Sequence, residues 1–174
     1  ENQRISNIDI LVSDNETVNI TGIPTKVFHT PGHTLGHVCF YMPEEKSLFS
    51  GDTLFYLGCG RVFEGTMDQM WLSLLKLRSL PEDTSVYCGH EYTLSNMKFA
   101  NYIDTKNALL NKVSLEIKNK REKGLPTVPF NLGVEKKINP FLRADDDNFI
   151  KLVGLSRNNA SECFGEIRLK KDSF

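Results

Sequence analysis

The chain has 174 residues, enough for one domain or for one core with a helical appendage. It is 40% hydrophobic and 25% charged, an ordinary composition for a globular protein, and its net charge of −1 excludes a strong positive field that would gather nucleic acid or anionic lipid. No apolar run reaches the roughly 18 residues of a membrane span, and we expect no signal or transit peptide. We therefore expect neither nucleic acid nor a membrane as a partner, and a monomer when the protein is complete.

The cysteines form neither a CxxC pair nor the spacing of a disulfide framework; they are Cys39, Cys59, Cys88 and Cys163. Single cysteines among apolar neighbours usually behave as small buried hydrophobic residues. We interpret Cys88 in this way, although a thiolate two residues before His90 is the alternative. The cysteine pattern predicts a reducing compartment, the cytoplasm or the mitochondrial matrix.

Up to about residue 90 the sequence predicts short strands separated by Gly, Pro and Asp. The expected strands cover residues 8–12, 25–28, 38–41, 47–49 and 84–87. One helix interrupts them: Thr66 and Gln69 form a Thr-x-x-Gln capping box, apolar residues then recur at helical spacing, and Pro81 ends the run. Strands interrupted by a helix are typical of an α/β layered fold.

After His90 the pattern becomes helical. We expect helices over residues 93–103 and 105–123, the second followed by Gly124 as its C-terminal cap. A Pro-rich connector covers residues 125–129, and a further helix is expected over residues 144–153, where acidic residues suit a helix N-terminus. The change of pattern places a domain boundary near residue 92, with a helical subdomain over residues 93–174.

Three motifs place a His or an Asp beside a Gly directly after an expected strand: TPGHTLGH at residues 30–37, SGDTLF at 50–55 and YCGHEY at 87–92. Because loops at the carboxyl ends of strands converge in α/β sheets, we expect His33, Asp52 and His90 to face one pocket. Imidazole and carboxylate suit zinc, iron and manganese. A lone His after a strand is more often structural, and an Asp after Gly is more often a turn residue. Three such motifs in order favour a metal site.

Taken together, the motifs TPGHTxGH, GDTLF, GCGRVFEGT, YCGHEYT and NPFLR resemble glyoxalase II, the hydroxyacylglutathione hydrolases, along almost the whole chain. GDTLF alone is typical of the metallo-β-lactamase superfamily, whereas residues 58–66, 90–93 and 139–141 narrow the resemblance to this family. It implies an α/β fold in which residues 1–92 form part of a metallo-β-lactamase αββα sandwich, the metal-binding half. Residues 93–174 would be the helical, substrate-binding subdomain.

The resemblance also implies roles for the strand-end residues. His33 would ligate a first metal, His90 a second, and Asp52 would bridge both and hold a hydroxide in line. His37 would hold its loop by hydrogen bonding, whereas His29 belongs to no family motif. The complete enzyme would hold two divalent metals, with zinc expected and iron or manganese also suitable.

An upstream THxHxDH motif completes both metal positions in the family, and these 174 residues do not contain it. The sequence begins with Glu1 rather than Met, so we expect it to be part of a longer gene product. We therefore expect partial or no metal occupancy in this chain by itself, and little or no activity.

The implied reaction hydrolyses S-D-lactoylglutathione and similar S-acylglutathione thioesters to D-lactate and glutathione by a metal-bound hydroxide, as in methylglyoxal detoxification. The residues expected to bind glutathione are Arg61, Phe63, Tyr92, Arg168 and Lys171. Phe63 stands where the family often has Tyr, so Tyr92 would supply the phenol. Arg168 and Lys171 would clamp the glycine carboxylate by charge-assisted hydrogen bonds.

Two alternatives remain open from the sequence. One is a sulfur dioxygenase of the same fold that acts on glutathione persulfide with one iron. The other is a truncated, non-catalytic remnant that binds glutathione. Oxygen uptake with the persulfide would indicate the first, and glutathione binding without turnover would indicate the second.

Overall fold

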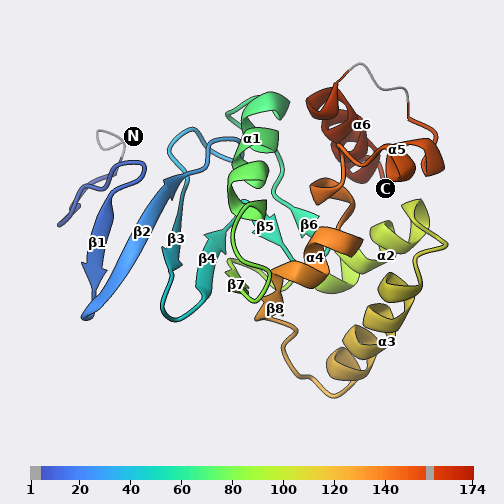
Figure 1. Cartoon of the computed structure of the whole chain (residues 1–174), viewed down its shortest axis with the longest axis horizontal. Helices are drawn as coiled ribbons and strands as arrows, with labels where there is room; N and C mark the ends of the chain where they lie inside the picture. Colours follow the sequence, from blue (N-terminus) through green and yellow to red (C-terminus); the bar gives the residue numbers. More distant parts are fainter. Residues whose placement is uncertain (1–4, 156–158) are drawn as a thin grey trace.

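The computed structural model describes residues 5–155 and 159–174, which form a mixed sheet with helices packed against it (Figure 1). The sheet has six strands, in the order β1 (Thr17–Ile20), β2 (Ile23–His29), β3 (Val38–Met42), β4 (Ser47–Gly51), β7 (Ser85–Cys88) and β8 (Phe130–Asn131). Neighbouring strands are antiparallel except for β4 and β7, which run parallel. The loops that follow β4 and β7 therefore leave the sheet at the same edge.

Between β4 and β7 the chain makes a small hairpin and one helix. The hairpin consists of β5 (Leu54–Phe55) and β6 (Gly58–Cys59), and the helix is α1 (Met67–Arg78). Thr66 and Gln69 form the capping box that the sequence predicts at its N-terminus. The helix turns Met70, Leu74 and Leu77 onto one face of the sheet, where all three are fully buried.

The second half of the chain is mainly helical. Its elements are α2 (Thr93–Ile103), α3 (Ala108–Glu122), α4 (Leu132–Ile138), the 3-10 helix η1 (Pro140–Leu142), α5 (Asp147–Leu152) and α6 (Ala160–Asp172). Figure 1 shows these helices beside β7 and β8, at the end of the sheet away from β1. Within the described ranges, no helix is long and apolar enough to cross a membrane.

Four of the five predicted strands are confirmed, and one is wrong. Residues 25–28, 38–41 and 47–49 lie in β2, β3 and β4, and 84–87 matches β7 within one residue. Residues 8–12 are irregular, with Ile10 and Leu11 exposed. An apolar run forms a strand only beside a partner, and the edge of β2 is taken by β1, a four-residue strand that was not predicted from the sequence. A two-residue turn joins them, with Thr21 and Gly22 at φ 52° and 92°.

The helix predictions are confirmed for α2 and, with a later start, for α3. Asn107 accepts a hydrogen bond from the backbone N–H of Leu110, so α3 begins at Ala108 rather than at residue 105. Gly124 follows it at φ 70°, as expected of a C-terminal cap. The helix predicted over residues 144–153 is shortened to α5, because Asp146 caps its N-terminus. The helices α4, η1 and α6 and the two-residue strands β5, β6 and β8 were not predicted from the sequence.

The hydrophobic core runs across the predicted boundary at residue 92. Trp71 of α1 stacks on Phe164 of α6 with ring centroids 6.0 Å apart, and Phe141 lies between Phe99 and Phe164. These side chains are buried in one cluster with Leu48 of the sheet. The strand-rich and helical parts are therefore packed on a shared core.

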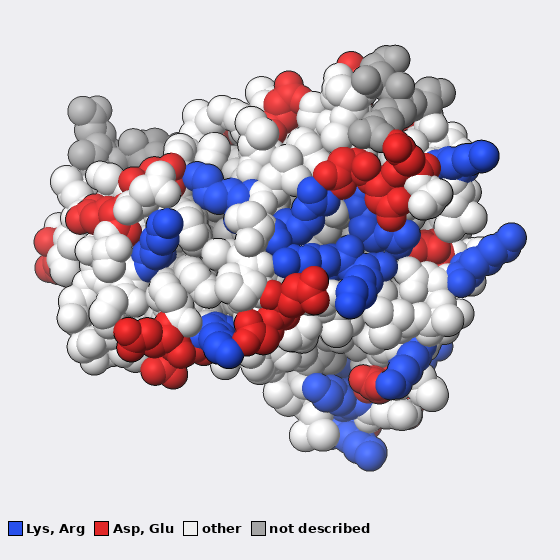
Figure 2. Space-filling model, viewed as in Figure 1, with Lys and Arg blue, Asp and Glu red and all other residues white. Residues whose placement is uncertain are grey.

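Charges of both signs mix on the surface. Figure 2 shows basic side chains gathered near the middle of one face with acidic side chains beside them. Ion pairs join Arg78 to Asp145, and Arg143 to both Asp104 and Asp146.

Candidate metal and substrate site

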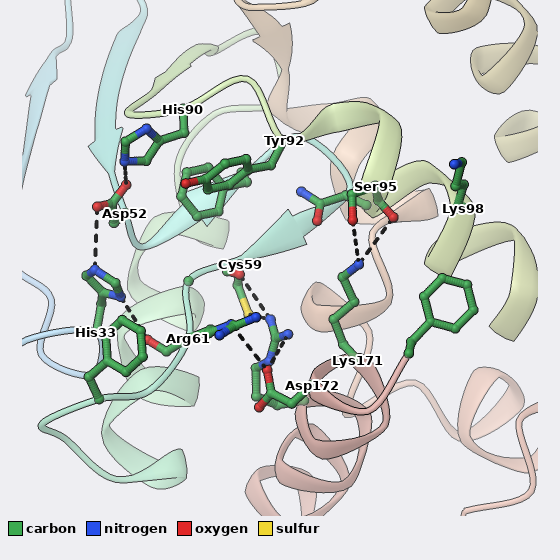
Figure 3. Close-up of a pocket in the computed structure, with 16 residues that line it drawn as sticks. His33, Asp52, Cys59, Arg61, His90, Tyr92, Ser95, Lys98, Lys171 and Asp172 are labelled. Carbon is green, nitrogen blue, oxygen red and sulfur yellow. Dashed lines mark hydrogen bonds and ion pairs between the residues drawn. The ribbon is translucent and has the colours of Figure 1, made fainter.

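The three strand-end residues converge on one point. His33 follows β2, Asp52 follows β4 and His90 follows β7. The Nε2 atom of His33 lies 3.4 Å from Oδ2 of Asp52, and Nε2 of His90 lies 3.5 Å from Oδ1 (Figure 3). Zinc ligands sit about 2.0–2.2 Å from the ion, so two ligands of one ion lie roughly 3–4 Å apart. The carboxylate thus lies between two imidazoles at the spacing of shared metal ligands.

The imidazole of His33 is oriented by the loop that carries Arg61. The carbonyl oxygen of Arg61 lies 2.9 Å from Nδ1 of His33. A carbonyl only accepts, so Nδ1 donates this hydrogen bond, and Nε2 is the ring nitrogen that faces Asp52. The ring of His33 also packs against Phe63, with centroids 5.0 Å apart, and His90 stacks on Tyr92 at 4.9 Å.

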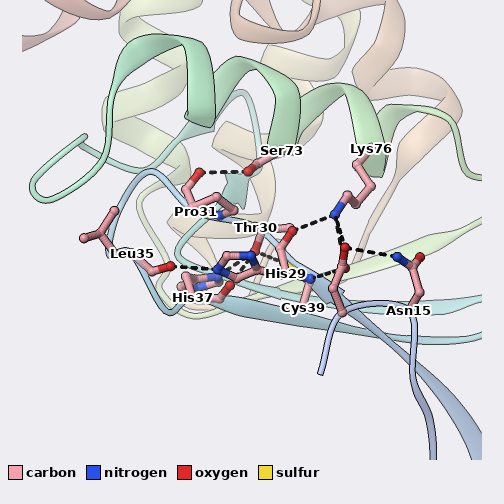
Figure 4. A network of polar contacts seen from close by, with 10 residues as sticks. Asn15, His29, Thr30, Pro31, Leu35, His37, Cys39, Ser73 and Lys76 are labelled. Atoms are coloured by element: carbon pink, nitrogen blue, oxygen red, sulfur yellow. Dashed lines mark hydrogen bonds and ion pairs between the residues drawn. The ribbon is translucent and has the colours of Figure 1, made fainter. Parts of the chain in front are cut away.

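His37 holds the backbone of Asp52 and does not point into the metal position. Its Nε2 accepts a hydrogen bond from the Asp52 backbone N–H at 3.0 Å, and its Nδ1 lies 2.9 Å and 3.0 Å from the hydroxyls of Thr30 and Thr53. Figure 4 shows His37 beside Thr30. Burial lowers the pKa of His37, which keeps the ring neutral and Nε2 able to accept.

The structure also shows room made for Asp52. A Cβ added to Gly89 would come within 2.7 Å of Oδ1 of Asp52, and one added to Gly60 within 2.0 Å of the Asp52 carbonyl oxygen. Oδ1 is buried without a hydrogen-bond partner. A buried anionic oxygen without a donor is costly unless a cation meets it. These residues therefore fit divalent metals bound by nitrogen and oxygen ligands.

The described residues offer two candidate ligands to each of two possible metal positions. One position has His33 and one oxygen of Asp52, and the other has His90 and the second oxygen. Within residues 5–155 and 159–174, no group of three or more His, Cys, Asp or Glu side chains could hold a single ion. Catalytic zinc usually has three protein ligands. Further ligands are thus needed to complete both positions.

A cavity of about 750 Å³ extends from these ligands toward the C-terminal helix. All the residues expected to bind glutathione line it, from Arg61, Phe63 and Tyr92 to Arg168 and Lys171. The sequence analysis did not predict other lining residues, Ser95, Asn96, Lys98 and Asp172. Two of these residues could have been predicted from their spacing. The HEYT motif ends at the first residue of α2, so Ser95 and Lys98 lie one helical turn apart on the same face.

Arg168 lies in the wall of the cavity, with its side chain only 5% exposed. Its guanidinium donates to the Cys59 carbonyl oxygen at 3.1 Å and to Asp172 at 2.9 Å, and it lies over the ring of Phe141. The Nε atom is buried without a partner. Arg168 therefore ties α6 to the β5–β6 hairpin in addition to any contact with a ligand.

Lys171 and Arg61 are more accessible to solvent than Arg168. The Lys171 ammonium donates to the backbone oxygen and the hydroxyl of Ser95, at 3.2 Å and 3.1 Å, and lies between the rings of Phe99 and Phe174. Burial, with Arg168 and Arg61 nearby, lowers its pKa. Arg61 is 68% exposed and lies 3.8 Å from Asp172. These two cations border the open part of the cavity.

The cysteines near the site are thiols. Burial raises the pKa of Cys59 to about 11, despite the neighbouring Arg168, so it is not a thiolate nucleophile at neutral pH. Cys88 is half-buried rather than fully buried, and its thiol donates to the His90 carbonyl oxygen. Burial raises its pKa also.

Comparison with known proteins agrees with this geometry. Residues 2–90 match the profile of the metallo-β-lactamase superfamily, and the BLEG-1 B3 metallo-β-lactamase structure aligns with a TM-score of 0.53 and 28% identity, over 77% of this chain and 48% of that one. Residues 91–174 match the profile of the hydroxyacylglutathione hydrolase C-terminus.

Two curated relatives carry the name of that enzyme. The hydroxyacylglutathione hydrolase of Rhodopseudomonas palustris (strain BisB5) is 47% identical over 99% of this chain and 68% of its own length. That of Rhizobium meliloti (strain 1021) is 48% identical over the whole chain and 68% of its own length. The chain therefore belongs to the hydroxyacylglutathione hydrolase family, also called glyoxalase II. This membership supports hydrolysis of S-lactoylglutathione, and the sulfur dioxygenase alternative is not favoured.

Proposed function

We propose that the protein hydrolyses S-D-lactoylglutathione and similar S-acylglutathione thioesters to D-lactate and glutathione. One observation carries the proposal. Two imidazoles face opposite oxygens of the Asp52 carboxylate at one end of a cavity, and the rest of that cavity is bordered by cations. A thioester of glutathione has its reactive carbonyl on the side chain of the central cysteine, and the two carboxylates are on the residues to either side. The carbonyl could therefore face the imidazoles while a carboxylate meets the cations further along the cavity.

We assign the two metal positions to three side chains. His33 and Asp52 would hold one divalent cation, His90 and Asp52 the second, with zinc as the proposed ion and iron or manganese also suited to the ligands. Bound there, such cations supply a Lewis acid for the thioester carbonyl and lower the pKa of a water toward neutrality. Asp52 is held by His37 through its backbone, so its carboxylate keeps its direction during the reaction.

The chain itself would bind and orient the substrate. Phe63 and Tyr92 pack against His33 and His90 and would flank the glutathione peptide next to the thioester. Lys171 and Arg168 would bind the glycine carboxylate, and Arg61 at the rim would contact the peptide. The leaving group is a thiolate, and since thiols have a pKa near 8.5 it needs little help from a general acid.

The residue ranges have a functional division in this proposal. Residues 1–92 would carry the metal ligands together with Arg61, Phe63 and Tyr92, and residues 93–174 would supply the carboxylate-binding Arg168 and Lys171. The four cysteines are free thiols, which fits the proposed cytoplasmic or mitochondrial-matrix location.

The test is a thioesterase assay on the complete protein with its metal content measured. We expect two metals per chain and release of free thiol from S-D-lactoylglutathione, both lost after treatment with a chelator. Oxygen uptake with glutathione persulfide, measured beside it, should be absent. A metal-loaded protein that consumes oxygen and leaves the thioester intact would show that the reaction is misassigned.

A further inference from the structure

The β5–β6 hairpin has a strained turn. Tyr56 and Leu57 form its two-residue loop, and Leu57 has φ 58°, in the left-handed region that branched, bulky side chains rarely adopt. Leu57 is nonetheless fully buried in a cluster with Ile138 of α4. Such a turn persists only where its surroundings fix it.

Two buried side chains from the helical half hold this turn. Glu135 of α4 is 0% exposed, and its Oε2 accepts from the Leu57 backbone N–H at 2.8 Å and from Nδ2 of Asn139 at 2.9 Å. The same Nδ2 lies 3.1 Å from the carbonyl oxygen of Gly58 and 3.4 Å from that of Phe55. One carboxyl and one amide thus satisfy backbone groups on both sides of the turn.

The hairpin that they hold forms one wall of the cavity. Phe55 and Cys59 both line it, and the ring of Phe55 lies 5.3 Å from that of Tyr92. The Cys59 carbonyl oxygen accepts from Arg168, and the chain continues from β6 directly to Arg61. A shift of the turn would therefore move an aromatic contact and the supports of two cations together.

We propose that Glu135 and Asn139 are positioning residues, which set the glutathione-binding wall by holding the β5–β6 hairpin in its strained conformation. Neither side chain lines the cavity, so both act through the hairpin. The inference rests on the proposed function, since it concerns the binding of that substrate.

The test compares variants of the complete, metal-loaded protein. Glu135→Met removes the acceptor and keeps a long side chain, whereas Glu135→Gln keeps an amide oxygen for the Leu57 N–H. Ile138→Val is the matched control, because it trims a fully buried neighbour on α4 that makes no polar contact with the hairpin. For each protein we would measure Tm, the Kd of glutathione, KM and kcat for S-D-lactoylglutathione, and hydrogen exchange at the Leu57 amide.

We expect Glu135→Met to raise the Kd of glutathione and KM about tenfold, which corresponds to about 1.4 kcal/mol. It should change kcat less and lose protection of the Leu57 amide. Glu135→Gln should restore both to near the parent values, and Ile138→Val should lower Tm without changing Kd. Loss of amide protection with unchanged Kd and KM would overturn the inference.

A second variant covers failure of Glu135→Met to fold. Asn139→Ala removes the bonds to the Phe55 and Gly58 carbonyl oxygens while Glu135 still pairs with Leu57. It should also raise Kd, and an unchanged Kd would overturn the inference. A parent protein that binds glutathione without hydrolysing the thioester would contradict the proposed function alone, because Kd and hydrogen exchange still test the hairpin.

Discussion

The two ends of the cavity are built in different ways. At the metal end, loops that follow strands carry His33, Asp52 and His90, and Oδ1 of Asp52 is buried without a hydrogen-bond partner. At the other end, the cations are already engaged within the chain: Arg168 with the Cys59 carbonyl oxygen and Asp172, and Lys171 with Ser95. The proposed metal end thus leaves a buried carboxylate oxygen that a cation would satisfy, whereas the cations at the substrate end are held by hydrogen bonds within the chain.

This difference predicts the largest effect at Asp52. Asp52→Asn should lower thioesterase activity by about three orders of magnitude or more, because the shared ligand of both metals loses its charge. Metal analysis should show fewer than two metals per chain. Asp83→Asn, which alters an exposed carboxylate paired with Lys46, is the matched control and should keep activity. Full activity in Asp52→Asn would exclude a bridging role.

A His37 variant tests whether metal binding depends on the hydrogen bond between His37 and the Asp52 backbone. His37→Leu removes the acceptor for the Asp52 N–H, and loss of such a supporting contact typically costs about 10- to 100-fold in metal affinity or activity. Competition with a chelator would measure the affinity. His29→Leu is the control, since His29 bonds only to the Leu35 carbonyl oxygen through its ring and lies outside the cavity lining. Equal affinities in the two variants would contradict the role of His37.

At the substrate end, Lys171→Ala should raise KM about tenfold or more with kcat nearly unchanged, because a charge-assisted contact made equally in ground and transition states is lost. Lys170→Ala changes the neighbouring lysine, which does not line this cavity, and should leave KM alone. Arg168→Ala should raise KM and also lower Tm, since the buried guanidinium of Arg168 links α6 to the β5–β6 hairpin. Unchanged KM in Lys171→Ala would remove this residue from the binding site.

The smallest expected effect concerns stability and pH. Burial raises the pKa of Glu135 to about 8 from its ordinary value of 4.5. The folded state therefore binds the proton more tightly than the unfolded state. The stabilisation that comes from this proton is complete below pH 4.5 and is lost as pH rises toward 8.

Glu135→Gln has no proton to lose at this position, so the parent should become less stable relative to the variant between pH 5 and pH 8. Denaturant unfolding of both proteins at several pH values measures the difference. Tyr56 faces the same site, and burial together with Glu135 raises its pKa, so it stays protonated throughout this range. A difference that does not change with pH would show that Glu135 titrates normally.

The residues at the metal end could be predicted from the sequence because each lies in a short motif directly after a strand. His33, Asp52 and His90 each follow an apolar strand and a Gly, and the carboxyl ends of neighbouring strands meet at an edge. The family resemblance implied that His37 holds its loop by hydrogen bonding, but its contact with the Asp52 backbone N–H was not predicted. The roles of these residues as ligands remain a prediction, which the convergence of their side chains supports.

The substrate end depends on contacts that sequence patterns do not encode. The residues around Arg168 in the sequence are typical of a solvent-exposed basic segment. Packing of α6 against α1 and η1 nevertheless buries Arg168. Glu135 is an ionisable residue in a short helix, and only the tertiary fold places it against Leu57, 78 residues earlier in the chain. Residues 8–12 failed as a strand for the same reason, since pairing is decided by neighbours distant in sequence.

The fluorescence of Trp71 can report how the C-terminal helix α6 packs against the rest of the protein. Trp71 is the only tryptophan in the chain, 4% exposed, and it stacks on Phe164 of α6, the helix that carries Arg168 and Lys171 into the cavity. Its emission therefore reports the docking of that helix without any added label. Release of α6 would expose the indole to water and shift the emission to longer wavelength, so assembly of the substrate end can be followed separately from occupancy of the metal end.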